Sequence, residues 1–259
     1  MQYRQGPVQI EQAADALLTR RINNTITARL APALRPQTLQ DAFAIQQAVV
    51  RKMADKQIDS VGGWKCALPD ADKLIASPIF ASTVYNQSPC PIKLDNGVCK
   101  IEPEIAFRFE QDLPARAERY SDEQIVAALG NAYLALELIQ SRYLAPDEVS
   151  YLEHLADGLF NQGVFLGPEI SLEQAFVASE INFTLHQSVS EKKAGQHPNQ
   201  FPQRPLFWLV NFLRQRGIDV KAGQVVITGS YAGVMEVQPD VEFSLQYGEL
   251  GSVVAILLE

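Results

Sequence analysis

The sequence predicts an α+β protein in which a helical segment comes first and a β-rich segment follows. Apolar residues recur at helical spacing over residues 8–31 and again over residues 39–53. From residue 61 onward, glycines and prolines separate short runs with the character of strands. We therefore expect an N-terminal helical lobe at residues 1–60 packed on a mixed, β-rich body at residues 61–259, the two forming one continuous structural domain.

Composition narrows the classes of function. The chain has 259 residues, enough for a substantial core, and is 47% hydrophobic and 20% charged, as ordinary globular proteins are. A formal net charge of −8 argues against nucleic acid or an anionic membrane as a partner. The apolar run at 253–258 is too short to span a bilayer, and residues 1–7 lack the hydrophobic core of a signal peptide. We expect a cytoplasmic protein.

The cysteines support this location. Cys66, Cys90 and Cys99 are odd in number and show no Cys-x-x-Cys spacing. Such a pattern is typical of reduced thiols in a cytoplasmic protein, and not of a disulfide framework or a zinc site.

The helical lobe shows clear boundaries but no catalytic residues. Pro32 and Pro36 interrupt the first predicted helix, at 8–31. Thr38 and Asp41 have the spacing of an N-terminal cap for the second helix, which extends to Met53. We expect this lobe to pack against the functional part of the molecule.

Strands and turns are predicted through the β-rich body. A strand at 62–66 carries Lys65, and a strand at 101–109 ends at the turn 111–114. A capping box at 121–124 begins a helix that Gly130 and Asn131 are expected to end. His154 is expected on a helix surface, not as a metal ligand. The remaining predictions are strands at 134–139 and 163–167, a mobile loop at 187–205, a helix at 206–216, and strands at 223–230, 241–247 and 251–258.

Three acidic residues form the candidate functional site. Alternation along the strand at 101–109 places Glu102 and Glu104 side by side on one face, with an apolar face behind them. Glu137 is the only charge in the apolar run at 134–139. Burying such carboxylates without partners is costly, and a shared cation removes the cost. Three carboxylate oxygens suit a hard ion such as Mg²⁺ or Mn²⁺.

Simpler interpretations of the same residues remain open. Glu102 and Glu104 can lie on a solvated strand face while Glu137 forms an ion pair with Arg142 or Arg108. Arg142 closes the Glu137 strand and is expected within reach of the carboxylates. Lys65, expected at a strand edge, can extend to solvent. Near a metal-held anion, Lys65 can instead bind a carboxylate or shuttle a proton, if burial and positive neighbours lower its pKa.

Five motifs in order resemble the 2-keto-4-pentenoate hydratase family of the fumarylacetoacetate hydrolase superfamily. The resemblance covers nearly the whole chain, including the segment Leu-Gln-Asp-Ala-Phe-Ala-Ile-Gln at 39–46. Each motif alone is weakly specific, but five motifs in the same order are hard to produce by chance. The motifs are Gly-Trp-Lys at 63–65, Ile-Glu-Pro-Glu-Ile-Ala-Phe at 101–107, Leu-Glu-Leu-Ile-Gln-Ser-Arg at 136–142, Gly-Gln-Val-Val-Ile-Thr-Gly-Ser at 223–230 and Gly-Glu-Leu-Gly-Ser-Val at 248–253.

This resemblance implies a fold, a metal and a reaction. It implies a twisted β-roll that holds Mg²⁺ or Mn²⁺ through Glu102, Glu104 and Glu137, with Lys65 as the catalytic residue. The substrate is a 2-hydroxy-2,4-dienoate or 2-oxo-4-enoate type acid from the degradation of aromatic compounds. The metal stabilises its enolate and water adds to the diene. Homo-oligomers are typical of the superfamily. Substrate binding is assigned to Arg142, Asp157, Asn161, Thr228 and Ser230.

The chain departs from the family pattern around the substrate. The family's Asp-Asn-x-Ser-Ser-Gly-like run is Asp-Gly-Leu-Phe-Asn-Gln-Gly at 157–163, so that Phe160 and Asn161 replace small hydroxyls expected to face substrate. The loop from Lys65 to Pro78 is shorter than usual, and a family acid is replaced by Ile79. The Gly-His-Pro that the family typically has before the helix containing Trp208 is replaced by Gln-Phe-Pro at 200–202.

Three functions follow from this comparison. A hydratase-type lyase is our preferred interpretation, and a 4-oxalocrotonate-type decarboxylase of 2-oxo-dioates is hard to separate from it because the same machinery can release CO₂. A carbon–carbon hydrolase ranks lower because that reaction uses a histidine–glutamate pair, and no histidine lies between Met1 and Arg142. A non-catalytic relative that binds a metabolite or assembles structurally is the third possibility.

Overall fold

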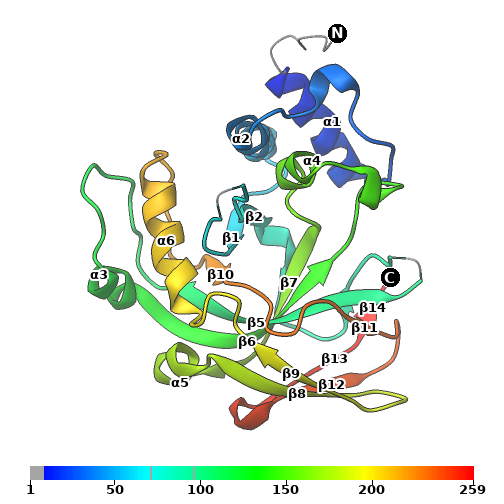
Figure 1. Cartoon of the computed structure of the whole chain (residues 1–259), viewed down its shortest axis with the longest axis vertical. Helices are drawn as coiled ribbons and strands as arrows, with labels where there is room; N and C mark the ends of the chain where they lie inside the picture. The colour runs from blue at the N-terminus through cyan, green and yellow to red at the C-terminus, as the bar shows by residue number, and fades with distance from the viewer. Residues whose placement is uncertain (1–8, 71, 96) are drawn as a thin grey trace.

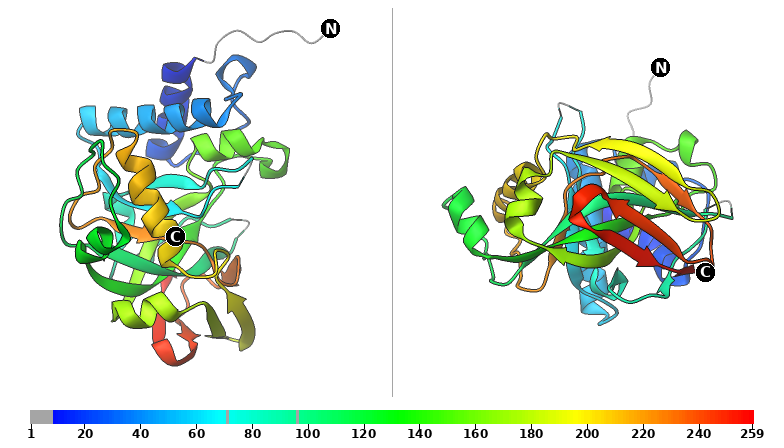
Figure 2. Two further views of the ribbon diagram at one scale, coloured as in Figure 1. Left: turned by 60° about the vertical axis from the view of Figure 1, so that its left-hand side comes forward. Right: turned by 90° about the horizontal axis from the view of Figure 1, so that it is seen from below.

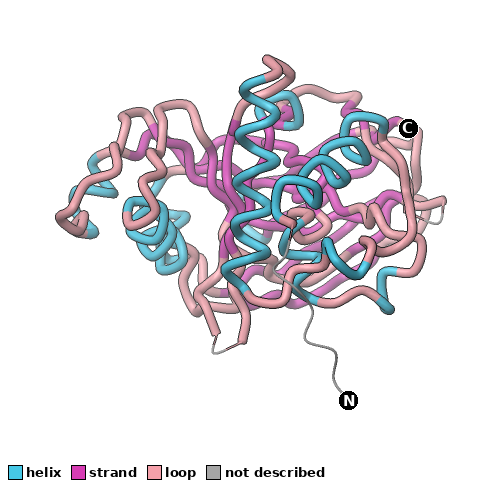
Figure 3. The backbone as a smooth tube through the Cα atoms, turned by 90° about the horizontal axis from the view of Figure 1, so that it is seen from above, coloured by secondary structure: helices cyan, strands magenta, loops and turns pink. Residues whose placement is uncertain are grey.

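A computed structural model of the chain describes residues 9–70, 72–95 and 97–259. Three helices (α1, α2 and α4) gather at one end of a large curled sheet, and a smaller sheet lies at the other end (Figure 1). Figure 2 shows the same order from two further sides, and Figure 3 shows helical segments lying over the strands in the view from above. Within the described residues, no helix combines the length and the hydropathy needed to cross a membrane.

The helices differ greatly in length. The two long N-terminal helices pack against each other and, through α2, against the short helix α4. Among the described residues, four short 3₁₀ turns complete the helical content: η1 (Pro32–Leu34), η2 (Ala81–Thr83), η3 (Pro146–Glu148) and η4 (Gly248–Leu250). The α-helices are α1 (Ile10–Asn23), α2 (Leu39–Asp55), α3 (Asp122–Ala127), α4 (Tyr151–Ala156), α5 (Leu172–Val177) and α6 (Gln203–Arg214).

The strands form a mixed β-structure. The two longest, β5 and β6, pair antiparallel at the centre of the large sheet, whereas β1 pairs parallel with β10. The strands are β1 (Val61–Cys66), β2 (Ala76–Phe80), β3 (Val84–Tyr85), β4 (Cys90–Pro91), β5 (Cys99–Phe109), β6 (Leu129–Ile139), β7 (Asn161–Ile170), β8 (Glu180–His186), β9 (Glu191–Gln196), β10 (Val225–Ile227), β11 (Met235–Val237), β12 (Phe243–Tyr247), β13 (Ser252–Ala255) and β14 (Leu257–Leu258).

The order of the strands explains the position of the long central pair. The large sheet has the order β2-β1-β10-β5-β6-β7-β3, with β11 also paired to β5. A four-stranded sheet has the order β13-β12-β8-β9, and β14 pairs with β4. The middle of β5 is buried on both faces, because a small second core containing Ala106, Ala135 and Ile227 covers the face opposite the main core. The predicted α+β class with a mixed sheet is confirmed.

Several boundaries predicted from the sequence are also confirmed. Thr38 and Asp41 form a reciprocal capping box at the start of α2. Ser121 and Gln124 do the same for α3. Cys66, Cys90 and Cys99 are free and buried. The division into 1–60 and 61–259 stays a prediction, and its residues 1–8, with the signal-peptide prediction at 1–7, lie outside the described residues.

Other boundaries were wrong. The first helix ends at Asn23 and not near residue 31, because Asn24 adopts a left-handed conformation (φ 50°) and the chain then leaves to pair with the segment around Tyr143. Gly130 does not end α3 but lies inside β6, where a side chain would collide with Glu110.

The segment predicted as a mobile loop at 187–205 contains β9 and the first turn of α6. β9 is an edge strand with the sequence Glu-Lys-Lys-Ala-Gly-Gln, in which glutamate, lysine, alanine and glycine all have low β-propensity, and its pairing with β8 supplies the hydrogen bonds that define it. Such pairing is a long-range contact, which local sequence pattern does not reveal.

Candidate metal centre

The pairing of β5 with β6 creates the site. Glu102 lies directly opposite Glu137 in the antiparallel register, and Glu104 lies two residues along the same face of β5. One carboxylate oxygen from each of the three residues lies within 4.8 Å of the others. The structure thus brings together the three acids that the sequence singles out.

Each buried carboxylate is held by specific donors. The backbone N–H of Gly229 donates to Glu104 Oε2 over 2.6 Å. Lys65 Nζ and Asn161 Nδ2 both donate to Glu137 Oε1, over 2.6 and 2.8 Å. The second oxygen of Glu137, Oε2, is buried and has no hydrogen-bond partner. This oxygen is therefore available to a cation.

The electrostatics also fit a cation. Burial, with the nearby charge of Glu137, raises the pKa of Glu102 to about 7. Burial and the same neighbour raise the pKa of Glu104 well above its ordinary value. Neighbouring carboxyl groups in a poorly solvated site resist ionisation, which raises their pKa values. A divalent ion bound among them would favour the ionised form and lower these pKa values. The all-oxygen donor set suits hard ions such as Mg²⁺, Mn²⁺ and Ca²⁺.

Within the described residues, Lys65 is the one ammonium group that bonds to any of the three carboxylates, and its partner is Glu137. It lies on β1, which has β2 on one side and β10 on the other, so the predicted position at an edge was wrong. Burial alone lowers the pKa of Lys65, but Glu137 and Glu102 outweigh it, and the pKa is raised. Lys65 is therefore a charged donor, and the lowered pKa considered from the sequence does not occur.

A strained segment supports Lys65. Gly158, Leu159 and Phe160 all have positive φ angles, of 95°, 54° and 65°, which is unusual for the two residues that carry side chains. The turn aims the carbonyl of Leu159 at Lys65 Nζ, 3.1 Å away. Phe160 stacks on His154 with ring centroids 4.2 Å apart. His154 is buried and its Nε2 donates to the carbonyl of Pro146, so its predicted surface position was wrong.

The carboxylates adjoin an open cleft of about 860 Å³. Lys65 and Glu102 line it directly, whereas Glu104 and Glu137 are buried behind the lining. Apolar walls come from residues including Ile75, Ile139, Leu159, Phe160 and Met235. The charged residues of the lining are Lys65, Asp95, Lys100, Glu102, Asp147, Glu191 and Glu236.

Arg142 does not reach the glutamates as the sequence suggested. Its Nε donates to Asp157 Oδ2 over 2.9 Å, its Nη1 to the carbonyl of Asn161, and its Nη2 to the carbonyl of Asp157. The ion pair is buried. Glu137 pairs with Lys65 and not with Arg142 or Arg108, so that alternative interpretation was also wrong.

The remaining predicted substrate-binding residues surround the centre without lining the cleft. Asn161 is buried and directed at Glu137. The Thr228 hydroxyl is buried 3.4 Å from His197 Nε2, and Ser230 donates to the carbonyl of Gly233. Thr228 and Ser230 flank Gly229, whose N–H holds Glu104. Their direct contact with a substrate stays a prediction.

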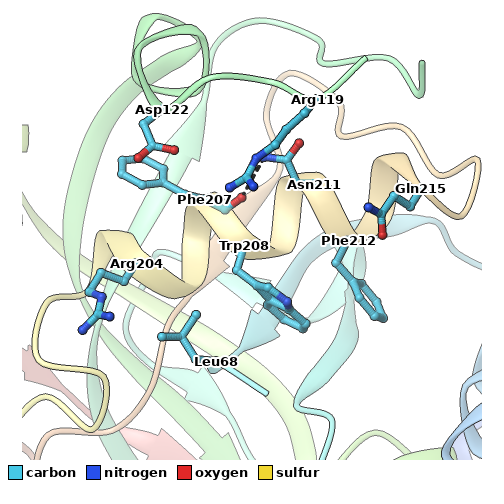
Figure 4. A pocket seen from close by; sticks show the side chains of 9 residues that line it. All are labelled: Leu68, Arg119, Asp122, Arg204, Phe207, Trp208, Asn211, Phe212 and Gln215. Carbon is cyan, nitrogen blue, oxygen red and sulfur yellow. Dashed lines mark hydrogen bonds between the residues drawn. The ribbon is translucent and has the colours of Figure 1, made fainter. Parts of the chain in front are cut away.

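A second hollow, beside α6, contains none of the predicted site residues. Its volume is about 410 Å³, and Trp208 and Phe212 line it with ring centroids 4.8 Å apart. Figure 4 shows these rings along α6 next to Leu68, with Asp122 and Arg119 on the far side of the helix. One carboxylate and two arginines among aromatic rings do not form a metal centre.

Sequence reasoning missed the backbone groups of the site. The Gly229 N–H and the Leu159 carbonyl belong to the main chain, which carries no residue-type signal. The signals that were present are Gly158, whose positive φ favours glycine, and Gly229, with φ 126°.

Comparisons with known proteins agree with the motifs. No family model matches the sequence. The chain is 27% identical over 229 residues to a 2-keto-4-pentenoate hydratase from Burkholderia vietnamiensis, which covers 84% of this chain and 86% of the relative. It is 26% identical over 184 residues to another from Paraburkholderia phymatum, covering 70% and 69%. The predicted family resemblance is confirmed.

A solved structure supports the same fold. It is the 4-oxalocrotonate decarboxylase from Pseudomonas putida G7 complexed with magnesium and adipate, with a TM-score of 0.78 and 20% identity. The match covers 96% of this chain and 97% of that protein. The α+β fold is therefore shared over nearly the whole chain.

Proposed function

We propose that the protein is a divalent-metal-dependent hydro-lyase that hydrates 2-hydroxy-2,4-dienoate or 2-oxo-4-enoate type acids, as in the degradation of aromatic compounds. The observation that carries this proposal is the convergence of Glu102, Glu104 and Glu137 beside Lys65 at the wall of an open cleft. The hydratases among the relatives support it.

Glu102, Glu104 and Glu137 would hold the ion, Mg²⁺ or Mn²⁺. When bound, it supplies a Lewis acid that stabilises negative charge on the oxygens of a 2-oxo acid. The chain itself orients the carboxylates: Gly229 fixes Glu104, and Asn161 with Lys65 fixes Glu137 Oε1. Glu137 Oε2 is left without a protein donor and remains an acceptor.

Lys65 is the proposed catalytic residue. Two of its three N–H groups are assigned, one to Glu137 and one to the Leu159 carbonyl. Because Lys65 also lines the cleft, the third can hold the substrate carboxylate or deliver a proton to carbon during ketonisation. Both acceptors keep Nζ at one position, which is the condition for efficient proton transfer.

The other assigned residues act around this pair in our proposal. Arg142 donates to the carbonyl of Asn161, and Asp157 holds Arg142, so both act on the site through Asn161 and Glu137. Thr228 and Ser230 flank Gly229 in the chain, and their contacts with His197 and with the Gly233 carbonyl hold this segment beside Glu104. As direct substrate contacts, all five residues remain predictions.

The cleft favours a substrate with a single carboxylate. Beyond the metal ligands, Asp147, Glu191 and Glu236 are exposed carboxylates on its lining, and Lys100 is bonded to Asp95. A second carboxylate at the far end of a dioate would meet this negative charge. We therefore rank a 4-oxalocrotonate-type decarboxylase second, although the shared fold supports it as a candidate.

The two other candidates have less support. A histidine–glutamate hydrolase requires a histidine at the site, and none of the cleft residues within the described ranges is a histidine. A non-catalytic relative was considered because Phe160 and Asn161 replace hydroxyls. Asn161 has a defined role toward Glu137, and Phe160 leaves the cleft open, so neither replacement removes the machinery.

The decisive experiment measures two products on one purified sample. With Mg²⁺ present, we expect loss of dienoate ultraviolet absorbance and no CO₂ release from a 2-oxo-dioate. Glu102→Gln removes one proposed ligand and should abolish both turnover and stoichiometric metal binding, whereas the exposed Glu180→Gln in β8 should change neither. Unchanged metal content and turnover in Glu102→Gln would exclude the proposal. CO₂ release without hydration would select the decarboxylase.

We further propose that the protein works in the cytoplasm as a homo-oligomer on a small 2-oxo acid, with neither nucleic acid nor membrane as a partner. The superfamily resemblance and the low pI of about 5.0 support this. Sedimentation velocity of the purified protein tests it. A monomer of 28.7 kDa at micromolar concentration would contradict the oligomer.

A further inference from the structure

Two cavities lie on opposite sides of one stretch of chain that follows β6. Ile139 and Ser141 line the metal cleft, whereas Gln140 and Arg142, which alternate with them, line a separate pocket of about 190 Å³. Residues that alternate along an extended chain point to opposite faces. This second pocket is therefore separated from the candidate metal centre by a single layer of backbone.

The second pocket is positively charged. Arg21, Lys93 and Arg142 line it, and its described lining includes no carboxylate. Donors from neutral side chains, including the amide of Asn24 and the hydroxyl of Tyr85, lie among them. This is the reverse of the metal cleft, whose lining carries five carboxylates and two lysines.

One polar side chain of this pocket has no hydrogen-bond partner from the described protein residues. Gln140 is 5% exposed, and its backbone N–H is fixed by the carbonyl of Phe160 over 2.8 Å. Its side-chain amide forms no hydrogen bond within the described part of the chain, although it lines the pocket. The donors and the acceptor of this amide are therefore free to bind a ligand that enters the pocket.

Two guanidinium groups share one acidic residue there. Arg21 Nη2 and Arg142 Nη2 both donate to the carbonyl of Asp157, over 2.9 and 2.5 Å. The Asp157 carboxylate bonds to Arg142. Burial and the charge of Arg142 lower the pKa of Arg21 to about 9, with weaker opposing attractions from Asp157 and from Asp59. An anion in the pocket would relieve this repulsion.

We propose that this pocket binds a small oxyanion, a carboxylate or a phosphate, through the Gln140 amide, the Lys93 ammonium and the Arg21 guanidinium. The volume is below that of pockets for drug-sized ligands and suits a small anion. Charged and amide donors around one cavity are the usual means of holding such groups. The proposal is independent of the reaction catalysed in the metal cleft.

Calorimetric titration of the full-length, Mg²⁺-loaded protein tests the proposal, with inorganic phosphate and acetate titrated separately so that the preferred oxyanion is identified. We expect at least one to bind. Gln140→Leu should weaken that binding about tenfold or more and Lys93→Gln about threefold, since each removes one donor. Lys192→Gln, an exposed lysine on β9, should leave the affinity unchanged.

A second variant separates the two cavities. If the anion binds in the metal cleft, binding should be lost in Glu102→Gln and kept in Gln140→Leu. This result would overturn the proposal. Anion bound in the second pocket gives the opposite pattern.

Thermal unfolding controls for folding. Gln140→Leu exchanges an unpartnered amide for an apolar group of similar length, so its unfolding temperature without anion should be unchanged or higher. The binding anion should raise the unfolding temperature of the wild type and not that of the variant. Absence of any heat or thermal shift with both anions at millimolar concentrations would overturn the proposal. The proposal would also be overturned if the wild type bound neither anion and Lys93→Glu changed the mass of the oligomer. That result would mean that the pocket receives an acidic side chain from a second copy of the chain and not a free anion.

Discussion

At the scale of single residues, the carboxylates of the metal centre differ in how they are held. Glu104 depends on a backbone N–H, whereas Glu137 Oε1 depends on the side chains of Lys65 and Asn161. Glu137 Oε2 has neither. Three donors of the protein thus orient Glu104 and Glu137, and Glu137 Oε2 stays free to bind an ion.

Lys65→Met tests the catalytic role at this scale. The change keeps the aliphatic length of the side chain and removes the proton donor, so we expect kcat to fall by about 10²–10⁴-fold. Metal content, measured by elemental analysis, should be retained because the three carboxylates remain. Lys192→Met is the matched surface control and should keep full activity; equal activity in both variants would remove Lys65 from the mechanism.

The raised carboxyl pKa values predict how the stability of the metal-free protein depends on pH. The folded pKa of Glu102 is about 7, and that of Glu104 is raised well above its ordinary value, whereas the unfolded value of each is near 4.5. The folded state therefore keeps protons that the unfolded state has lost, and stability falls as pH rises through these folded pKa values. The slope is up to about 1.4 kcal/mol per pH unit for each group.

Thermal unfolding between pH 6.5 and 8 in the presence of EDTA measures this effect. The buried His197, whose pKa burial lowers to about 4, opposes this effect near pH 6.5, where about half of the unfolded histidine is protonated, and contributes little above about pH 7.5. We expect the unfolding temperature to fall with rising pH in EDTA and to be nearly constant with Mg²⁺. Glu104→Gln should reduce the slope in EDTA; an equal slope in wild type and variant would place its origin elsewhere.

At the scale of elements, strand register and one left-handed turn set the geometry. The β5–β6 register aligns Glu102 with Glu137, and the turn Gly158–Leu159–Phe160 aims one carbonyl at Lys65. A side chain added at Gly158 would lie 3.1 Å from Arg21 Nη2 and 3.2 Å from Ser77 Oγ, in addition to the cost of its positive φ.

Gly158→Ala should therefore lower both stability and turnover. We expect a loss of about 1–3 kcal/mol in the free energy of unfolding, from backbone strain and crowding, and a lower kcat because the Leu159 carbonyl moves. Gly217→Ala is the matched control: its φ is +71°, and nothing lies within 4 Å of the added carbon. That variant should lose about 1 kcal/mol in urea unfolding and keep its kcat.

The sequence predicted those parts of the site that depend on residue type and local period. Alternation along 101–109 placed Glu102 and Glu104 together, and the isolated charge of Glu137 marked it as a ligand candidate. The contacts of Arg142 and Asn161 could not be predicted, because they depend on a left-handed turn between Asp157 and Asn161 that carries two non-glycine residues. β9 was missed because its pairing with β8, and not its own composition, defines it.

At the scale of the whole molecule, one buried acid joins the N-terminal segment to the rest. Glu153 on α4 is fully buried and accepts from Arg29 over 2.5 Å, with Arg35 3.9 Å away. Its Oε2 also accepts from the Ser150 hydroxyl at the cap of α4. The chain between α1 and α2 is thereby fixed to the helix that carries His154 and leads into the turn at Gly158.

Glu153→Gln should loosen this attachment. Removing the charge leaves two arginines without their partner, and we expect a loss of about 2–4 kcal/mol in the free energy of unfolding. The value lies in the lower part of the usual range for buried pairs because the Arg29 side chain is 34% exposed. Glu148→Gln, an exposed acid in η3, should cost less than about 0.5 kcal/mol. Equal losses in the two variants, measured by chemical denaturation, would contradict this role for Glu153.

The hydrogen bond from Gly229 to Glu104 has a consequence for how the centre can diverge. The donor belongs to the main chain, and residue 229 is itself restricted to glycine, because its φ is 126° and an added Cβ would lie 2.8 Å from Pro198 Cγ. Few substitutions can therefore alter the anchoring of Glu104 without straining the backbone, while the contacts of Glu137 change with single substitutions at Lys65 or Asn161. Descendants of this gene that acquire a different ion preference or reaction should carry their replacements on the Glu137 side.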